Sequence, residues 1–372
     1  MEQIILFSFL ALFPFGQIIK IGIVSPIDIV VGIGAIYAVT RKYKKPEIFK
    51  YFENFLFLAA SSWIFGFFLF QSQAVFYGLL YLARLAAYFY FFLLVFNFAG
   101  KNRKLLLNCL LAVSVASAVF GWIQYFLFPS IRAFFEYGWD EHLFRLVGTF
   151  LDPTFLGLIM VFGLIATIFR MMVVKKREKY LLIGIFLLIS LAFTYSRASF
   201  IALLGALIYF GIYEKKVREV LRAMVIFSLI IIFLPRPGGE GVNLGRTNSI
   251  AAKISNYKET LKIFKASPVL GIGFNNMCLA RQIYIGPESF SSHACSGSDS
   301  SLLLILATTG VSGFFVFCDL VFNIWKRASG VFKSSLIALF VHSLFSNSMF
   351  YPWIMGYLII LLATTLRRKS EG

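Results

Sequence analysis

The chain has 372 residues, of which 59% are hydrophobic, 18% aromatic and only 14% charged, with a formal net charge of +18 at pH 7. A soluble domain has roughly 45–50% apolar and about 25% charged residues, so this composition excludes an ordinary soluble protein. The basic residues lie in short clusters between apolar runs, which argues against a nucleic-acid partner and for a membrane protein.

Apolar runs near 20 residues long recur through the chain, and each can cross a hydrocarbon layer of about 30 Å. They predict an all-α, polytopic membrane protein with about twelve transmembrane helices. The predicted spans are residues 3–19, 27–40, 54–70, 74–98, 105–127, 152–169, 180–196, 199–213, 220–234, 299–322, 333–350 and 352–366. We expect three parts, which are an N-terminal bundle over 1–234, an outer loop over 235–298 and C-terminal helices over 299–372.

Lysine and arginine predict the orientation of these spans. With the N-terminus inside, basic clusters such as Arg41–Lys45 and Arg170–Lys179 fall on the same side. The positive-inside rule assigns that side to the cytoplasm. The first apolar run has no small-residue cleavage site, so we expect a span there and not a cleaved signal peptide. Both termini are then cytoplasmic, and the long loop faces outward.

The loop over 235–298 carries a second pattern. Apolar residues recur in it at helical spacing with lysines between them; these are Ile250, Ile254, Tyr257, Leu261 and Phe264, with Lys253, Lys258, Lys262 and Lys265. The pattern predicts an amphipathic helix on the bilayer surface or over a cavity. Cys278 and Cys295 lie later in this loop, and they either pair in an oxidising compartment or remain free thiols.

Arg84 lies in the middle of the predicted span 74–98, where a charge is costly. Two interpretations stay open for it. It pairs with a polar group on a neighbouring helix, or it binds an anionic lipid head group.

Three further arginines are expected on the outer side. Arg197 occupies a very short turn between two spans, Arg246 precedes the amphipathic helix, and Arg145 precedes the span that begins at 152. Interfacial snorkelling or solvation would explain each of them alone. Together they suit a diphosphate, because the planar guanidinium binds phosphate oxygens bidentately and stays charged.

Candidate acids and bases are few. His142 and His293 are expected outside the membrane, His342 within a span, and Asp152 and Asp299 at the outer ends of spans. Motifs of the HExxH, DxD, GxSxG and Walker types are absent from the sequence, which argues against zinc hydrolases, nucleotide-sugar enzymes and ATPases. We therefore expect neither a metal nor a cofactor.

Four stretches, taken together, resemble the O-antigen ligase and O-antigen polymerase (Wzy-type) membrane family. They are RLVGTFLDPTFLG, FTYSRASFIALL, RTNSIAAKISNYKETLKIFKASPVLGIGFNN and SDSSLLLILATTGVSG, in that order along the chain. The resemblance implies a membrane glycosyltransferase with a GT-C-like fold. It also implies that the protein lies in the bacterial inner membrane with its long loop in the periplasm.

The resemblance further implies a donor glycan carried on undecaprenyl diphosphate, with the lipid diphosphate as leaving group. By position, Arg197 and Arg246 would bind that diphosphate and stabilise the charge that develops on it. Arg145, Arg84 and His293 would assist in binding the substrate. Membrane lipids are expected partners, and a flippase and a chain-length regulator are partners left open.

One departure from the family pattern bears on the reaction. Ligases of the family place a histidine about eleven residues before the first glycine of the re-entry segment, and here that position holds Asp299, with His293 nearby. A carboxylate can accept the proton of an attacking sugar hydroxyl, so we favour a polymerase. A helix N-cap is the structural alternative for Asp299. Transfer to lipid A core or protein by a ligase, and transport by a flippase, are the functional alternatives.

Overall fold

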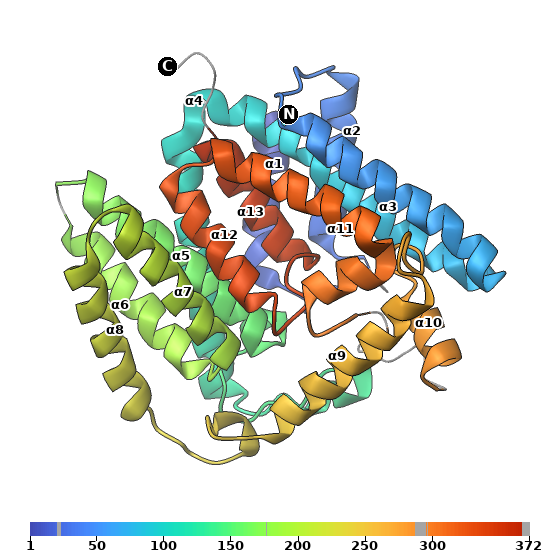
Figure 1. The fold of residues 1–372 in the computed structure, drawn as a ribbon. Coiled ribbons are helices and arrows are strands. Elements are labelled where there is room, and N and C mark those ends of the chain that lie inside the picture. The colour runs from blue at the N-terminus through green and yellow to red at the C-terminus, as the bar shows by residue number, and fades with distance from the viewer. Residues whose placement is uncertain (21–23, 176, 287–294, 296, 367–372) are drawn as a thin grey trace.

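A computed structural model describes residues 1–20, 24–175, 177–286, 295 and 297–366 (Figure 1). In this part of the chain the regular elements are helices, and a single isolated bridge joins Ser130 to Leu143. The all-helical prediction is therefore confirmed for the described residues.

The helices follow one another along the chain with short connections, apart from residues 128–152 and the loop 235–298, which are called the two outer segments here. They are α1 (Glu2–Leu12), α2 (Pro26–Thr40), α3 (Phe49–Phe70), α4 (Phe76–Leu127), α5 (Pro153–Val173), α6 (Glu178–Phe193), α7 (Arg197–Tyr213), α8 (Val217–Ile232), α9 (Asn248–Ala266), α10 (Met277–Tyr284), α11 (Ser301–Arg327), α12 (Gly330–His342) and α13 (Pro352–Thr365). Helices α2, α5 and α13 begin with proline, which is favoured at the first helical position because its missing N–H would have no partner there.

Four of the described helices are long and apolar enough to cross a membrane. They are α3, the run Gln73–Leu127 that contains α4, α5 and α11, while α1, α2, α7, α12 and α13 are shorter apolar helices. Helix α4 covers two predicted spans, and its backbone leaves helical geometry at Asn102, where the two spans were expected to separate. The number of about twelve spans stays a prediction.

The predicted span 333–350 is wrong in its second half. Helix α12 ends at His342, and residues 343–351 form an irregular loop. This loop is rich in serine and asparagine, whose side chains compete with the backbone for helical hydrogen bonds. Two of its carbonyl groups, those of Leu344 and Phe345, instead accept hydrogen bonds from Tyr257 and Lys253 of α9.

Helix α11 is broken at Gly310, which has φ +67° and ψ −172°. The segment Ser267–Gly273 fills the break, because the Val311 N–H donates to the Pro268 carbonyl at 2.9 Å and the Ile272 N–H donates to the Ala307 carbonyl at 3.0 Å. Irregular backbone inside a membrane protein is tolerated only where its polar groups find such internal partners. The break thus anchors the segment that follows α9 in the bundle.

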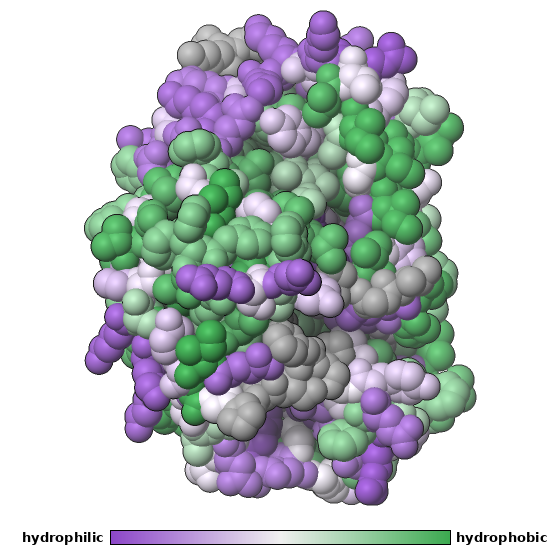
Figure 2. Space-filling view, turned by 90° about the vertical axis from the view of Figure 1, so that its right-hand side faces the viewer, coloured by the Kyte–Doolittle hydropathy of each residue, from purple (hydrophilic) through white to green (hydrophobic). Residues whose placement is uncertain are grey.

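Helix α9 runs obliquely across the end of the molecule opposite the N-terminus (Figure 1). On the face that Figure 2 shows, hydrophobic side chains form a belt in the upper part of the molecule, below a hydrophilic cap at the end where Figure 1 places the N-terminus. The lower part of this face is mixed and more hydrophilic, and it is the end that α9 crosses.

Candidate functional site

The turn between α6 and α7 is the point at which three predicted arginines meet. Helix α6 ends at Phe193 and α7 begins at Arg197, with Ser196 as its N-cap. The Arg145 guanidinium is buried, with 6% exposure, and donates to the Thr194 carbonyl at 2.9 Å and to the Tyr195 carbonyl at 3.3 Å. The structure therefore confirms the short turn and places Arg145 beneath it.

Arg246 approaches the same turn from the outer segment. Its Nη2 donates to the Tyr195 carbonyl at 3.4 Å, and its Nη1 donates to the carbonyls of Gly241 and Asn243 at 2.8 and 2.9 Å. The Arg197 side chain extends from the turn towards the start of α9. It donates to the Arg246 carbonyl at 2.8 Å and to Ser249 Oγ at 2.6 Å. Arg197 thus connects the turn to the first residues of α9.

The three arginines Arg145, Arg197 and Arg246, called the arginine cluster below, are partly removed from water. Desolvation, followed by the charges of Arg246 and Arg197, lowers the pKa of Arg145 to about 9. The pKa of Arg246 is lowered as well, first by desolvation and then by the charge of Arg197. Their partners are mostly neutral carbonyl groups. The carboxylates of Asp152, Asp140 and Glu240 offset the mutual repulsion only in part, and the repulsion that remains favours the binding of an anion.

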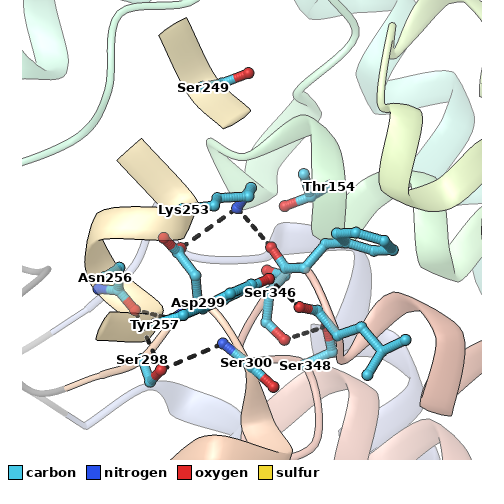
Figure 3. A network of polar contacts seen from close by, with 12 residues as sticks. Thr154, Ser249, Lys253, Asn256, Tyr257, Ser298, Asp299, Ser300, Ser346 and Ser348 are labelled. Atoms are coloured by element: carbon cyan, nitrogen blue, oxygen red, sulfur yellow. Dashed lines mark hydrogen bonds and ion pairs between the residues drawn. The ribbon is translucent and has the colours of Figure 1, made fainter. Parts of the chain in front are cut away.

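Asp299 lies at the start of α11 beneath α9, as Figure 3 shows. Its Oδ1 is 3.4 Å from Nζ of Lys253, which also donates to the Phe345 carbonyl at 2.5 Å. Its backbone N–H donates to Asn256 Oδ1 at 2.9 Å. The N-cap of α11 is Ser300, whose hydroxyl accepts from the Leu303 N–H. The N-cap interpretation of Asp299 is therefore wrong, and its carboxylate remains available, with 39% of the side chain exposed.

The predicted amphipathic helix exists as α9, but its polar stripe faces the bundle. Ser249, Lys253, Asn256 and Thr260 recur at helical spacing and bind Arg197, Asp299 and the Ser298 hydroxyl. Three residues of the predicted apolar stripe are largely exposed instead, namely Ile250 (48%), Ile254 (48%) and Leu261 (40%). Helix α9 therefore covers Asp299 through polar contacts, which a ligand with polar groups can replace.

The fully buried His342 connects the two sides of the site. Its Nε2 is 3.2 Å from Ser199 Oγ, near the arginine cluster, and its Nδ1 is 2.6 Å from Ser348 Oγ, in the loop 343–351 that binds Lys253. Ser199 in turn donates to the Thr154 carbonyl at 3.1 Å. The chain of hydrogen bonds fixes the turn of α7 relative to that loop.

Arg84 and Asp152 each have a structural partner, and Asp152 lies near enough to Arg145 for its charge to raise the pKa of that arginine. Arg84 Nη2 is 3.0 Å from Asp28 Oδ2, the structural pairing that was one of its two interpretations. Asp152 is the N-cap of α5 and accepts from the Thr154 N–H at 2.6 Å. His293 lies outside the described residues.

Sequence reasoning did not select Lys253, Asn256 or Ser348 as site residues. A signal existed for Lys253 and Asn256, because they recur at helical spacing with Ser249 and Thr260 and so share one face of the predicted helix. Ser348 was hidden within a span that was predicted to be helical to residue 350. Within the part of the chain that the structure describes, no three His, Cys, Asp or Glu side chains gather as a metal site would require.

Cys278 and Cys295 form a disulfide, which decides between the two alternatives for this pair. The bond joins α10 to the residue four positions before Asp299. Disulfides persist in oxidising compartments, which agrees with the outward orientation expected for this loop.

Comparison with known proteins adds one match. Residues 182–318, a little over a third of the chain, match the family model described as O-antigen ligase (Wzy_C), whereas no curated protein matches the chain. The matched segment runs from α6 into α11 and contains Arg197, Arg246, Lys253 and Asp299. The segment that carries the candidate site is thus similar to the family described as O-antigen ligase.

Proposed function

We propose that this protein is a polysaccharide polymerase of the O-antigen type. It would transfer a glycan from an undecaprenyl-diphosphate-linked donor to a sugar hydroxyl of a lipid-linked acceptor, at the outer face of the bacterial inner membrane. The observation that carries the proposal is that one helix, α9, contacts both parts of a transfer site. Its Ser249 binds Arg197 of the arginine cluster, and its Lys253 binds the Asp299 carboxylate.

The chemistry assigned to these residues is an exchange at the anomeric carbon. The acceptor hydroxyl oxygen forms a bond to this carbon, the bond from the carbon to the diphosphate oxygen breaks, and the Asp299 carboxylate takes the hydroxyl proton. The leaving lipid diphosphate keeps the bonding electrons. Arg197 and Arg246 supply the positive charge that stabilises it, so the proposed reaction needs no metal or other cofactor.

Arg145 has a supporting role in this proposal. Its guanidinium is buried under the turn and donates to two of its carbonyls, so it adds charge and holds the turn that carries Arg197. Arg84 stands apart, paired to Asp28, and a contact between Arg84 or His293 and the substrate remains a proposal. A flippase that delivers lipid-linked units and a chain-length regulator are the proposed protein partners.

The test uses purified protein in lipid vesicles with lipid-linked repeat units and a chelator. We expect a ladder of longer glycans on the lipid diphosphate. Arg197→Ala and Arg246→Ala should each reduce the rate about 100-fold or more, the usual cost of losing one charge-stabilising donor in a transfer site. Arg132→Ala, which removes an exposed arginine of the other outer segment, is the matched control.

Arg197→Lys serves as a second variant, because Arg197 also connects the turn to α9 and its loss could disturb the fold. Thermal melting of each variant separates the two effects. A normal ladder from well-folded Arg197→Ala and Arg246→Ala proteins would refute the proposal.

A ligase is the second candidate, favoured by the description of the matching family model. The acceptor separates the two activities. Label that appears on lipid A core or on protein would identify a ligase, whereas label on longer lipid-diphosphate glycans would identify a polymerase.

A further inference from the structure

The first outer segment closes on itself. The Ile131 N–H donates to the His142 carbonyl at 3.1 Å, and the Phe144 N–H donates to the Pro129 carbonyl at 2.9 Å. These backbone hydrogen bonds bring the two ends of a loop together. Residues 133–141, called the outer tip below, therefore begin and end at one place on the molecule.

The chain that follows this loop is fixed to the bundle. Gln124 Oε1, at the end of α4, accepts from the N–H groups of Val147 and Gly148 at 3.0 and 3.1 Å. The Leu146 N–H donates to the Phe193 carbonyl at 2.9 Å, where α6 ends. The outer tip is thus held beside the α6–α7 turn. A surface that is fixed before binding loses little conformational entropy when a ligand binds to it.

The outer tip is acidic, in a chain whose formal net charge is +18. It carries Glu136, Asp140 and Glu141, and its sequence contains no lysine or arginine. All three acidic residues are exposed. Because like charges repel one another, the outer tip repels the phosphates of a lipid diphosphate and of anionic lipid head groups. A ligand of the outer tip therefore has no phosphate at the contact.

The outer tip also carries exposed aromatic rings. The exposed fractions of Phe134, Phe135 and Tyr137 are 37%, 67% and 72%. Trp139, by contrast, packs against a small apolar cluster that includes Ile131. Three exposed rings within four residues form a patch, and exposed apolar patches mark interaction sites.

The carboxylate of Asp140 places the outer tip next to the candidate base. The pKa of Asp140 is raised first by desolvation and then by the charges of Asp152 and Asp299, while the charges of Lys253 and Arg145 lower it. Between charges that water reaches, such effects extend over about 10 Å. The charge of Asp299 acts on Asp140 more strongly than the charge of Arg145 does. The outer tip therefore lies beside the Asp299–Lys253 pair.

A neutral sugar has the chemistry that complements this surface. Its hydroxyl groups donate hydrogen bonds to carboxylate oxygens, which are acceptors only. The C–H groups on the face of a sugar ring carry a small positive charge and pack against the negative face of an aromatic ring. A bilayer would also accept the aromatic rings, but its anionic head groups are repelled by the three acidic residues. The outer tip thus favours a glycan over a lipid surface.

We infer that the outer tip binds the acceptor glycan beside the sugar that reacts at Asp299, through the Asp140 carboxylate and the rings of Phe135 and Tyr137. The inference rests on the proposed function and adds an acceptor subsite to it. The acceptor is favoured over the donor because its reacting end has no phosphate. The reacting end of the donor carries the diphosphate, which the outer tip repels and the arginine cluster attracts.

The test measures binding of a glycan without its lipid, so that it stands apart from the test of the reaction. The probe is the oligosaccharide freed by mild acid from the lipid-linked repeat units, and it is titrated into the full-length protein in nanodiscs. Asp140→Ala should weaken binding about tenfold or more, the effect of losing a hydrogen bond to a charged group. Tyr137→Ala should weaken it about fivefold, the effect of losing one ring contact. Thermal melting checks that both variants are folded.

Two matched controls locate the effect. Glu219→Ala and Phe233→Ala remove an exposed acidic residue and an exposed ring that lie outside the outer tip, and both should leave the affinity unchanged. A further titration contains an excess of undecaprenyl diphosphate without sugar. We expect no competition from it, because the acceptor glycan and the leaving lipid diphosphate occupy the site together during the proposed transfer.

No binding of the oligosaccharide by the wild-type protein, competition by undecaprenyl diphosphate, or unchanged affinity in both variants of the outer tip would each overturn the inference. Unchanged affinity is the result expected if the aromatic rings enter the bilayer instead. The proposed function fails by a different result, namely no glycan elongation by a protein that binds the oligosaccharide. Binding that depends on the outer tip, without elongation, would thus support the subsite and reject the reaction.

Discussion

The ammonium group of Lys253 lies between the Asp299 carboxylate, at 3.4 Å, and the Phe345 carbonyl, at 2.5 Å. It thereby joins three segments that are far apart in the sequence, which are α9, the start of α11 and the loop after α12 (Figure 3). The contact covers the candidate base with the outer helix. A substrate that reaches Asp299 has to displace the Lys253 ammonium group or bind beside it.

Replacing Lys253 should therefore affect transfer more than folding. In Lys253→Met we expect the elongation rate to fall about two- to fivefold, because a partly exposed ion pair contributes no more than about 1 kcal/mol. Lys253→Arg should retain most of the rate. Lys262→Met, on an exposed part of the same helix, is the control. Initial rates on lipid-linked units measure the effect, and an unchanged rate in Lys253→Met would exclude this role.

Acid should destabilise the protein through His142. Burial, followed by the charge of Arg145, lowers the pKa of His142 from 6.5 to about 4. Between these two values the unfolded chain binds a proton that the folded protein does not bind, so stability falls as the pH drops from 6.5 towards 4. We expect the melting temperature in detergent to decrease over this range, and to decrease less in His142→Gln. Parallel curves for the two proteins would show that His142 has no part in the acid sensitivity.

The disulfide can be tested by counting thiols. Of the four cysteines, Cys109 and Cys318 are free, so the denatured protein should take up two maleimide labels without reductant and four after reduction. Cys278→Ser opens a loop with a sequence separation of 17 and should cost about 3 kcal/mol of stability. Cys318→Ser is the control. Four labels on the unreduced protein would show that Cys278 and Cys295 do not pair.

Gly310 should be intolerant of substitution. A Cβ at this position would lie 2.1 Å from the Val269 carbonyl oxygen, and the backbone has φ +67°. Gly310→Ala is expected to cost about 3 kcal/mol or more, because neither α11 nor the segment packed into its break can move away. Gly32→Ala, where a Cβ meets no atom within 4 Å, should leave stability unchanged. The melting temperature and the monodispersity of the two purified variants measure this difference, and equal melting temperatures would contradict the prediction for Gly310.

Much of the outer helix could be predicted from the sequence, because helical spacing of apolar residues and a following proline are local signals. The same holds for the turn before α7, where two apolar runs meet at Arg197 with no room for a longer connection. The orientation of α9 could not be predicted in this way. In the sequence, the lysines and the asparagine of this helix are typical of a solvent-exposed face. In the structure, Lys253 and Asn256 face the bundle, because they bind Asp299 and Ser298 there.

The sequence by itself determined the class of protein, the helical architecture and the stretches that resemble the O-antigen ligase and polymerase family, because composition, periodicity and motif order are properties of the chain. The tertiary structure alone decided which partners the charged groups have. Arg84 forms an ion pair with Asp28, and Cys278 forms a disulfide with Cys295. Ser300, and not Asp299, is the N-cap of α11. These outcomes depend on which segments meet in space, and in a bundle of many similar apolar helices no local pattern specifies that.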